Sequence, residues 1–203
     1  MVDQAGPRDG DDRVMGRHSE PELFVTLMST RLRLEPIRTR HAADLFEAFR
    51  DPALYVFETD APPRDLATLR RRYERLESGR SPAGDEHWLN WIPVVRESGA
   101  AIGFVQATVD DDLQYASIGY AIVTAHQRHG YGVEAVGAMA DHLLEQGVAL
   151  LHAVIDVRNA ASIALVERLR FERTGTRRST DVIGGVRGFD HDYVLRGRRP
   201  GPR

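Results

Sequence analysis

Residues 115–157 read YASIGYAIVTAHQRHGYGVEAVGAMADHLLEQGVALLHAVIDV, and this stretch decides the fold of the chain. It begins with a strand-like apolar run and continues with a helical pattern that places Ala135, Met139 and Leu143 on one face before Gly147. The final apolar run, LLHAVIDV, is short and bounded by loops, which favours a buried strand. This order predicts a βαβ unit with parallel strands and a right-handed crossover.

The segments on either side of this unit predict further strands and helices. A period of two in residues 31–37 indicates a first strand, and Thr39 is placed to cap a helix over residues 40–51. We expect further strands at 87–97, 100–110, 171–178 and 190–197, and further helices at 64–79 and 159–170. The prediction is an α/β (α+β) fold, a mixed and mostly antiparallel sheet of about six to seven strands with helices on both faces.

Length and local polarity predict how the chain is divided. A length of 203 residues fits one domain. Residues 1–20 are too polar to bury a core, so we expect a disordered N-terminal arm, a single domain over residues 21–197 and a frayed tail over residues 198–203. The chain shows neither a signal-peptide core nor a run of about 18 apolar residues. These features predict a cytoplasmic protein without a membrane partner.

Composition excludes several classes of function. A net charge of -3 argues against a DNA-binding protein, and the absence of cysteine removes disulfides, thiolate metal sites and cysteine nucleophiles. His126 and His129 lie three residues apart, but no third group has a metal-ligand spacing, so we expect no metal. The arginine-rich segment RRRYER, residues 70–75, is interpreted as a solvated helix face, with an RNA or ribosome contact left open.

Two glycines stand between the strand and the helix of the βαβ unit. Gly130 and Gly132 precede a helix N-terminus, where backbone amides and the helix dipole favour an anion such as a phosphate. The pattern lacks the GxxxxGK[ST] of a triphosphate loop and the third glycine of a dinucleotide fingerprint. Taken alone, the two glycines are equally consistent with a plain tight turn.

The surroundings of these glycines resemble a known family. Residues 116–135, ASIGYAIVTAHQRHGYGVEA, are similar to the acetyl-CoA-binding segment of the GNAT superfamily of N-acetyltransferases, whose signature is Gln or Arg, two residues, Gly, one residue, then Gly or Ala. A second match follows in residues 154–171, VIDVRNAASIALVERLRF. The segments look most similar to the branch of ribosomal-protein N-terminal (Ala/Ser) acetyltransferases.

This resemblance implies a fold and a cofactor. The fourth and fifth strands are expected to be parallel and to splay, leaving backbone groups free for the pantetheine arm of acetyl-CoA. An amide near Ile122 is expected to polarise the thioester carbonyl, Asn159 to bind the pantetheine, and the amides of residues 128–133 to hold the pyrophosphate. The implied cofactor-binding residues are Ile122, Val123, Gln127, Arg128, His129, Gly130, Tyr131, Gly132, Val133, Asn159 and Ser162.

The sequence departs from the family pattern at two positions. Arg170 stands where the family usually has glycine, so we expect that turn to be built differently. Val166 stands where many relatives carry a tyrosine that protonates the leaving thiolate. Ser162 is the catalytic candidate to replace it, with an ordinary helix serine as the alternative. Glu58 and Asp60 are candidates to take the amine proton or bind a cationic substrate, unless Asp60 only caps a helix.

The resulting hypothesis is an acetyl-CoA-dependent N-acetyltransferase in which a primary amine attacks the thioester directly. The amine is either a protein N-terminus, such as that of a ribosomal protein or peptide, or a small molecule. An acyl-CoA-binding protein without turnover and a ribosome-interaction module are the alternatives. A homodimer is also left open.

Overall fold

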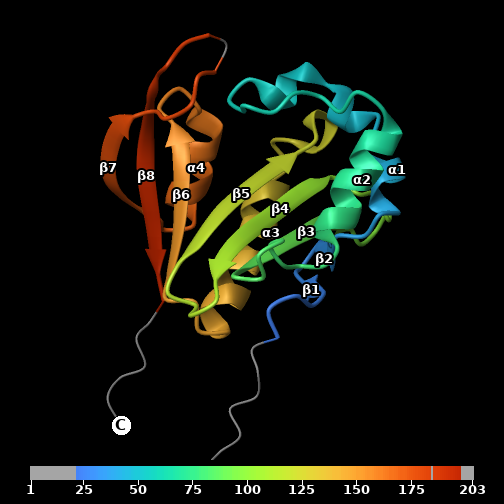
Figure 1. The fold of residues 1–203 in the computed structure, drawn as a ribbon, viewed down its shortest axis with the longest axis horizontal. Coiled ribbons are helices and arrows are strands. Elements are labelled where there is room, and N and C mark those ends of the chain that lie inside the picture. The colour runs from blue at the N-terminus through green and yellow to red at the C-terminus, as the bar shows by residue number, and fades with distance from the viewer. Residues whose placement is uncertain (1–21, 184, 198–203) are drawn as a thin grey trace, which may run out of the picture.

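An eight-stranded mixed sheet organises the part of the chain that the computed structural model describes, residues 22–183 and 185–197 (Figure 1). The strands follow the spatial order β1-β2-β3-β4-β5-β6-β8-β7, and only β5 and β6 are parallel neighbours. This confirms the predicted mixed and mostly antiparallel sheet. The predicted arm, residues 1–20, and tail, residues 198–203, lie outside the described residues.

The elements alternate along the chain much as the hydrophobic periodicity indicates. The strands are β1 (Leu27–Met28), β2 (Leu32–Pro36), β3 (Glu86–Val95), β4 (Gly103–Asp110), β5 (Ala116–Ile122), β6 (Leu150–Asp156), β7 (Glu172–Arg178) and β8 (Phe189–Arg196). The α-helices are α1 (His41–Leu45), α2 (Leu66–Leu76), α3 (Tyr131–Glu145) and α4 (Ala160–Arg168). Short 3-10 helices cover Ala48–Arg50, Pro52–Tyr55 and Thr124–His126. The short β1 is the strand that the sequence pattern does not predict.

The helices lie on both faces of the sheet, as predicted. Figure 1 shows α1 and α2 on one face and α3 behind the sheet. The predicted core face of α3 is confirmed, because Ala135, Met139 and Leu143 are fully buried. On β3, Trp91 is also fully buried, and its indole lies edge-on to the ring of His142 on α3. The apolar core therefore holds α3 against the strands that precede it in the chain.

The β5–β6 pair divides the sheet into two parts. The pair has the predicted parallel direction, but its register contains only Ala116 opposite Leu151 and Ser117 opposite His152. Beyond these two residue pairs the strands separate, and β6 continues in a seven-pair antiparallel ladder with β8. The predicted splay of the central parallel strands is therefore present.

The first helix differs from the prediction over residues 40–51. Thr39 does not cap it, because its hydroxyl donates to Glu77 and its backbone N–H donates to the same carboxylate. After five residues α1 gives way to turns and the 3-10 helix Ala48–Arg50. Asp51 is extended, as is favoured for a residue before proline, and its carboxylate caps the next 3-10 helix.

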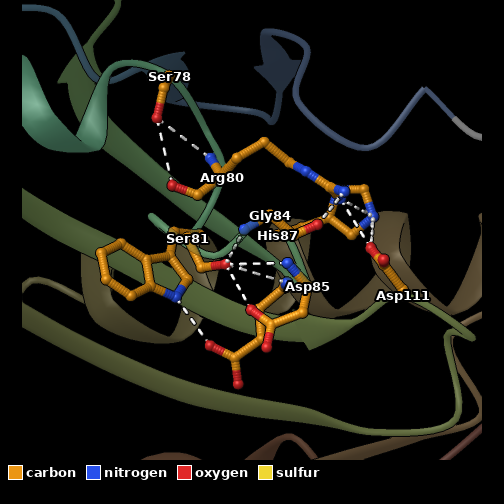
Figure 2. A network of polar contacts seen from close by, with 9 residues as sticks. Ser78, Arg80, Ser81, Gly84, Asp85, His87 and Asp111 are labelled. Atoms are coloured by element: carbon orange, nitrogen blue, oxygen red, sulfur yellow. Dashed lines mark hydrogen bonds and ion pairs between the residues drawn. The ribbon is translucent and has the colours of Figure 1, made fainter.

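The loop from α2 to β3 is fixed by a polar network (Figure 2). The hydroxyl oxygen of Ser81 accepts the backbone N–H groups of Gly84, Asp85 and Glu86 at 3.0 to 3.2 Å. Arg80 donates to the carbonyl of Gly84 and, on the other side, to the carboxylate of Asp111 in the turn after β4. The network therefore joins the C-terminal end of α2 to the β4–β5 turn.

Candidate functional site

The gap between β5 and β6 leaves backbone groups of β5 without a strand partner. The N–H of Val123 donates to the carbonyl of Ile102 at 2.9 Å, and Ile122 lies opposite Gly103 in the β4–β5 register. In an antiparallel ladder this makes Ile122 part of a non-hydrogen-bonded pair, so its backbone groups point away from β4. By the same alternation, those of Tyr120 also point into the gap.

Two of the predicted cofactor residues shape this edge in different ways. Gln127 donates its side-chain amide to the carbonyl of Ile122 at 2.9 Å, which leaves the Ile122 N–H as the group directed into the gap. Val123 offers no free backbone group, because its N–H is bound to Ile102 and its carbonyl accepts from His126. The open edge is thus formed by residues that precede Val123.

A tight turn brings the chain from β5 into α3. Arg128 and Gly130 both have left-handed backbone conformations, with φ of 64° and 81°. Gly130 is the N-cap of α3 and provides no capping side chain, so the amides of Tyr131, Gly132 and Val133 are the open first-turn donors of the helix. Such a helix start favours an anion such as a phosphate.

The second glycine has a different role from the one its sequence position suggests. A Cβ atom on Gly132 would lie 2.9 Å from Cδ1 of Leu165 on α4 and 3.7 Å from Cγ1 of Ile122. Gly132 therefore allows α3 to pack closely against α4, whereas Gly130 supplies the positive φ of the turn.

An arginine outside the predicted motif supports the turn. Arg31, just before β2, donates through Nη1 to the carbonyl of His129 at 2.9 Å. Its Nε pairs with Glu134 in the first turn of α3 at 2.7 Å, and its guanidinium lies 4.5 Å from the centre of the Tyr131 ring. Glu134 also accepts from Ser29, and these contacts hold its pKa below the usual value despite partial burial. The motif alone gives no signal for this support.

The start of α4 forms the opposite side of the gap. Asn159 caps α4, and its Oδ1 accepts the N–H of Ser162 at 3.1 Å. Both residues line a cavity of about 90 Å³ together with Gly119 and Tyr120 of β5. The hydroxyl of Tyr120 donates to the carbonyl of Ser162 at 3.3 Å, and burial raises the pKa of this phenol to about 12. The structure thus brings two hydroxyl groups together in the gap.

Tyr120 is a candidate catalytic residue that the sequence pattern does not reveal. The family comparison directs attention to the position of Val166 on α4, which is fully buried. Tyr120 reaches the same helix from β5, a strand that the sequence indicates only as a source of backbone contacts. A tyrosine in the strand just before the glycine turn is the one available signal.

A second cavity of about 330 Å³ lies between α2, the 3-10 helix Pro52–Tyr55, and the sheet. Phe49, Leu69 and Phe104 are among its apolar lining residues, and Asn90 and Gln106 provide amide groups from the sheet. It is an apolar cavity with a small number of polar groups, as is common for small-molecule sites.

Glu58 lies at the border of the two cavities and lines both. Although it retains surface exposure, desolvation by the surrounding walls raises its pKa, and the charge of Asp60 raises it further. Asp60 lines only the larger cavity, and its carboxylate is paired with Arg72 of α2 at 2.8 Å. Asp60 does not cap α2, because Asp65 has that role. Of the two predicted carboxylates, Glu58 is placed between the cavities.

The turn after α4 corrects one expectation about its construction. Arg170 adopts the left-handed conformation, with φ of 64°, that a glycine would adopt more easily. Its N–H donates to the carbonyl of Glu167 and that of Phe171 donates to the carbonyl of Val166, which is a Schellman motif. The turn keeps the glycine type of geometry with an arginine in it.

Residues 22–183 and 185–197 lack two features, a metal site and a membrane-spanning helix. Within them, no group of three or more His, Cys, Asp or Glu side chains could hold a metal ion. In the same part of the chain, no helix combines the length and the apolar character needed to cross a membrane.

An open strand edge beside a bare helix N-terminus can hold a long, phosphorylated molecule. The chain belongs to the acetyltransferase (GNAT) domain family, whose model matches residues 31–172. This confirms the predicted family and the predicted enzyme class, an N-acetyltransferase. No curated protein matches the sequence.

Solved structures of similar fold include ribosomal-protein acetyltransferases. Mycobacterium smegmatis RimJ in complex with CoA-disulfide has a TM-score of 0.75 at 18% identity, covering 84% of this chain and 87% of that chain. The ribosomal-protein-S5-alanine acetyltransferase of Vibrio fischeri has a TM-score of 0.74 at 17% identity, covering 88% of this chain and 100% of that chain. A probable GNAT acetyltransferase of Chromobacterium violaceum has a TM-score of 0.72 at 22% identity, covering 97% of this chain and 96% of that chain.

Proposed function

We propose that this chain is an acetyl-CoA-dependent N-acetyltransferase in which a primary amine attacks the thioester directly. The observation that carries the proposal is the meeting of two cavities at Glu58, one reaching the open edge of β5 and the other lying under α2. Such a junction lets a thioester and an amine approach each other from different sides. The complex of RimJ with a CoA derivative supports the same choice of cofactor.

The residues present fit acetyl-CoA. Backbone groups of Tyr120 and Ile122 directed into the gap suit the amides of a pantetheine arm, and Asn159 lies at the edge of the same cavity. The open amides of residues 131–133 suit a pyrophosphate, with Gln127, Arg128 and His129 in the turn before them. When bound, acetyl-CoA supplies the activated acetyl group.

The residues around the junction have separate tasks in this mechanism. The Ile122 N–H is directed to stabilise negative charge on the thioester oxygen. Glu58, with its raised pKa, binds the ammonium group and accepts its proton, while Asp60 holds Arg72 in place. A hydroxyl in the gap returns a proton to the departing sulfur. Ser162 and Tyr120 are the two candidates for that donor.

The acceptor in this proposal is either a protein N-terminus or a small-molecule amine. Both present an ammonium group that Glu58 can bind. The fold similarity to a ribosomal-protein-S5-alanine acetyltransferase makes peptide N-termini the first class to test.

A second function, acyl-CoA binding without turnover, is favoured by one observation. Val166 is fully buried at the position where the family comparison places a catalytic tyrosine, so the proton donor must come from elsewhere. If neither Ser162 nor Tyr120 serves, the site holds the cofactor and transfers nothing.

Calorimetric titration of the purified protein with acetyl-CoA and with desulfo-CoA, followed by mass spectrometry of amines and peptides incubated with acetyl-CoA, tests both functions. We expect binding of both compounds and acetylated product only with acetyl-CoA. Binding without product from any acceptor supports the second function, and no binding at all contradicts both.

A further inference from the structure

The larger cavity has an unusual distribution of charge. Four arginines line it, Arg64, Arg71, Arg72 and Arg75, against two carboxylates, those of Glu58 and Asp60. Both carboxylates come from the segment before α2, whereas three of the arginines belong to α2 itself. The cavity is therefore acidic at the junction with the β5–β6 gap and basic along α2.

The arginines of α2 differ in how they are paired. Arg72 forms an ion pair with Asp60 at 2.8 Å. Arg71 donates to the hydroxyl of Thr68, and within residues 22–183 and 185–197 neither Arg71 nor Arg75 has a carboxylate at ion-pair distance. The two are four residues apart and so lie on the same side of the helix. They form an unneutralised pair of cations beside the cavity.

Most of the other side chains that line the cavity are apolar. They include those of Ile37, Phe49, Leu54, Leu69 and Phe104. A volume of about 330 Å³ lies at the small end of the range for ligand pockets. The cavity thus matches a short molecule with an apolar body better than a folded protein surface.

We propose that the acceptor is a small amine that carries an anionic group, a carboxylate or a phosphoryl group, at the far end of a short apolar body. This inference rests on the proposed function. The ammonium end meets Glu58, the body fills the cavity, and the anionic end meets Arg71 and Arg75. The amine nitrogen forms a bond to the acetyl carbon as the carbon–sulfur bond breaks. The nitrogen loses two protons as the ammonium becomes an amide: one passes to Glu58 before the attack, and the second replaces the proton that a hydroxyl in the gap gives to the sulfur.

A matched series of acceptors tests the proposal. We would measure kcat/KM at low salt for straight-chain ω-amino carboxylates and ω-amino phosphonates of increasing length, each against the carboxamide of the same length. We expect the best anionic acceptor to exceed its carboxamide by about three- to tenfold, which is the range for two solvent-exposed ion pairs. The two anionic arms distinguish a carboxylate from a phosphoryl group.

Variants on α2 separate specific contacts from general charge. The ratio of anionic to carboxamide acceptor should fall to about one in Arg71→Gln/Arg75→Gln. It should be unchanged in Arg70→Gln, a matched control, because Arg70 is an exposed arginine of α2 that does not line the cavity. Far-ultraviolet circular dichroism and melting temperature establish that each variant is folded.

Each other result overturns the inference in a distinct way. Equal rates for anionic and carboxamide acceptors, or an equal loss of preference in Arg70→Gln, exclude recognition by Arg71 and Arg75. Acetylation of peptide N-termini alone overturns the small-molecule class but retains the proposed function. Absence of product from every acceptor overturns the proposed function as well.

Discussion

The phenol oxygen of Tyr120 lies 3.3 Å from the backbone carbonyl oxygen of Ser162, so a side chain of β5 donates across the gap to the first turn of α4. Burial raises the pKa of this phenol to about 12, which keeps it protonated at neutral pH. A phenol is a stronger acid than an alkyl hydroxyl even after this shift. Of the two hydroxyl groups, that of Tyr120 is therefore the stronger acid and releases a proton more easily.

We expect Tyr120→Phe to lower kcat by about 10²-fold or more, the usual range for loss of a general acid. Ser162→Ala should lower kcat by a smaller factor, because an alkyl hydroxyl is a weaker acid than the phenol, and the bond from Tyr120 to the backbone carbonyl of Ser162 is kept in this variant. Steady-state kinetics with calorimetric Kd values for CoA test this. A larger effect of Ser162→Ala would assign the proton to the serine.

Glu58→Gln should abolish the acidic limb of the pH profile of kcat/KM. Because the pKa of Glu58 is raised, activity in the parent protein should fall at a pH above the ordinary glutamate value. We expect the variant to lose about 10²-fold in kcat/KM near neutral pH. Asp60→Asn is the control, and it should keep an acidic limb that is shifted to lower pH, because the charge of Asp60 raises the pKa of Glu58. Disappearance of the limb in Asp60→Asn and its survival in Glu58→Gln would assign the proton to Asp60.

The same variant should be more stable than the parent protein at neutral pH. A raised pKa in the folded state means that the ionised carboxylate is disfavoured there, so the free energy of unfolding falls as pH rises through that pKa. The higher melting temperature of Glu58→Gln should therefore be seen at pH 7 to 8. It should vanish below about pH 4.5, where the carboxyl is protonated in both states. Calorimetric melting at these pH values is the measurement.

Gly132→Ala should weaken cofactor binding through α4. The added methyl group meets Leu165 at 2.9 Å, a contact that forces α3 and α4 apart or moves the leucine. We expect the Kd for CoA to rise by about three- to tenfold. Because Leu165 is the obstruction, Gly132→Ala/Leu165→Val should recover most of the loss, and a double-mutant cycle measures the coupling. Additive effects of the two changes would contradict this account.

Arg170→Gly should stabilise the fold by about 0.5–1 kcal/mol. Glycine removes the side-chain strain of the left-handed conformation, although it adds entropy to the unfolded chain. Arg168→Gly, inside the last turn of α4, is the matched control and should destabilise by about 1 kcal/mol. Chemical denaturation of both variants provides the test, and destabilisation by Arg170→Gly would mean that its side chain makes compensating contacts.

The sequence predicts the βαβ unit well because its signals are local and agree with one another. The helical face of Ala135, Met139 and Leu143 and the short apolar run of β6 leave little choice of period. The first helix is predicted poorly, since the apolar spacing that buries Leu45 and Phe49 is compatible with both α and 3-10 turns. Tertiary contacts, such as that between Thr39 and Glu77, decide the outcome there.

The site is predictable only where it depends on backbone geometry. The turn at Gly130 follows from a glycine before a helix, whereas the contact of Gly132 with Leu165 depends on how two helices pack. The arginines of residues 70–75 have the pattern of a solvated face, and only the fold shows that Arg71, Arg72 and Arg75 border a cavity. The disordered arm and frayed tail, the homodimer and the cytoplasmic location stay predictions.

Only two residue pairs join β5 to β6, so the sheet consists of two parts, one with β1 to β5 and one with β6 to β8, that are connected by a short parallel ladder. A molecule bound along the gap would contact both parts of the sheet over a much greater length than this ladder does. Binding in the gap should therefore make the two parts of the sheet unfold together. The thermal unfolding transition should become sharper, and the melting temperature should rise. If the proposed cofactor occupies the gap, its binding and the cooperativity of unfolding should both depend on this one missing stretch of ladder.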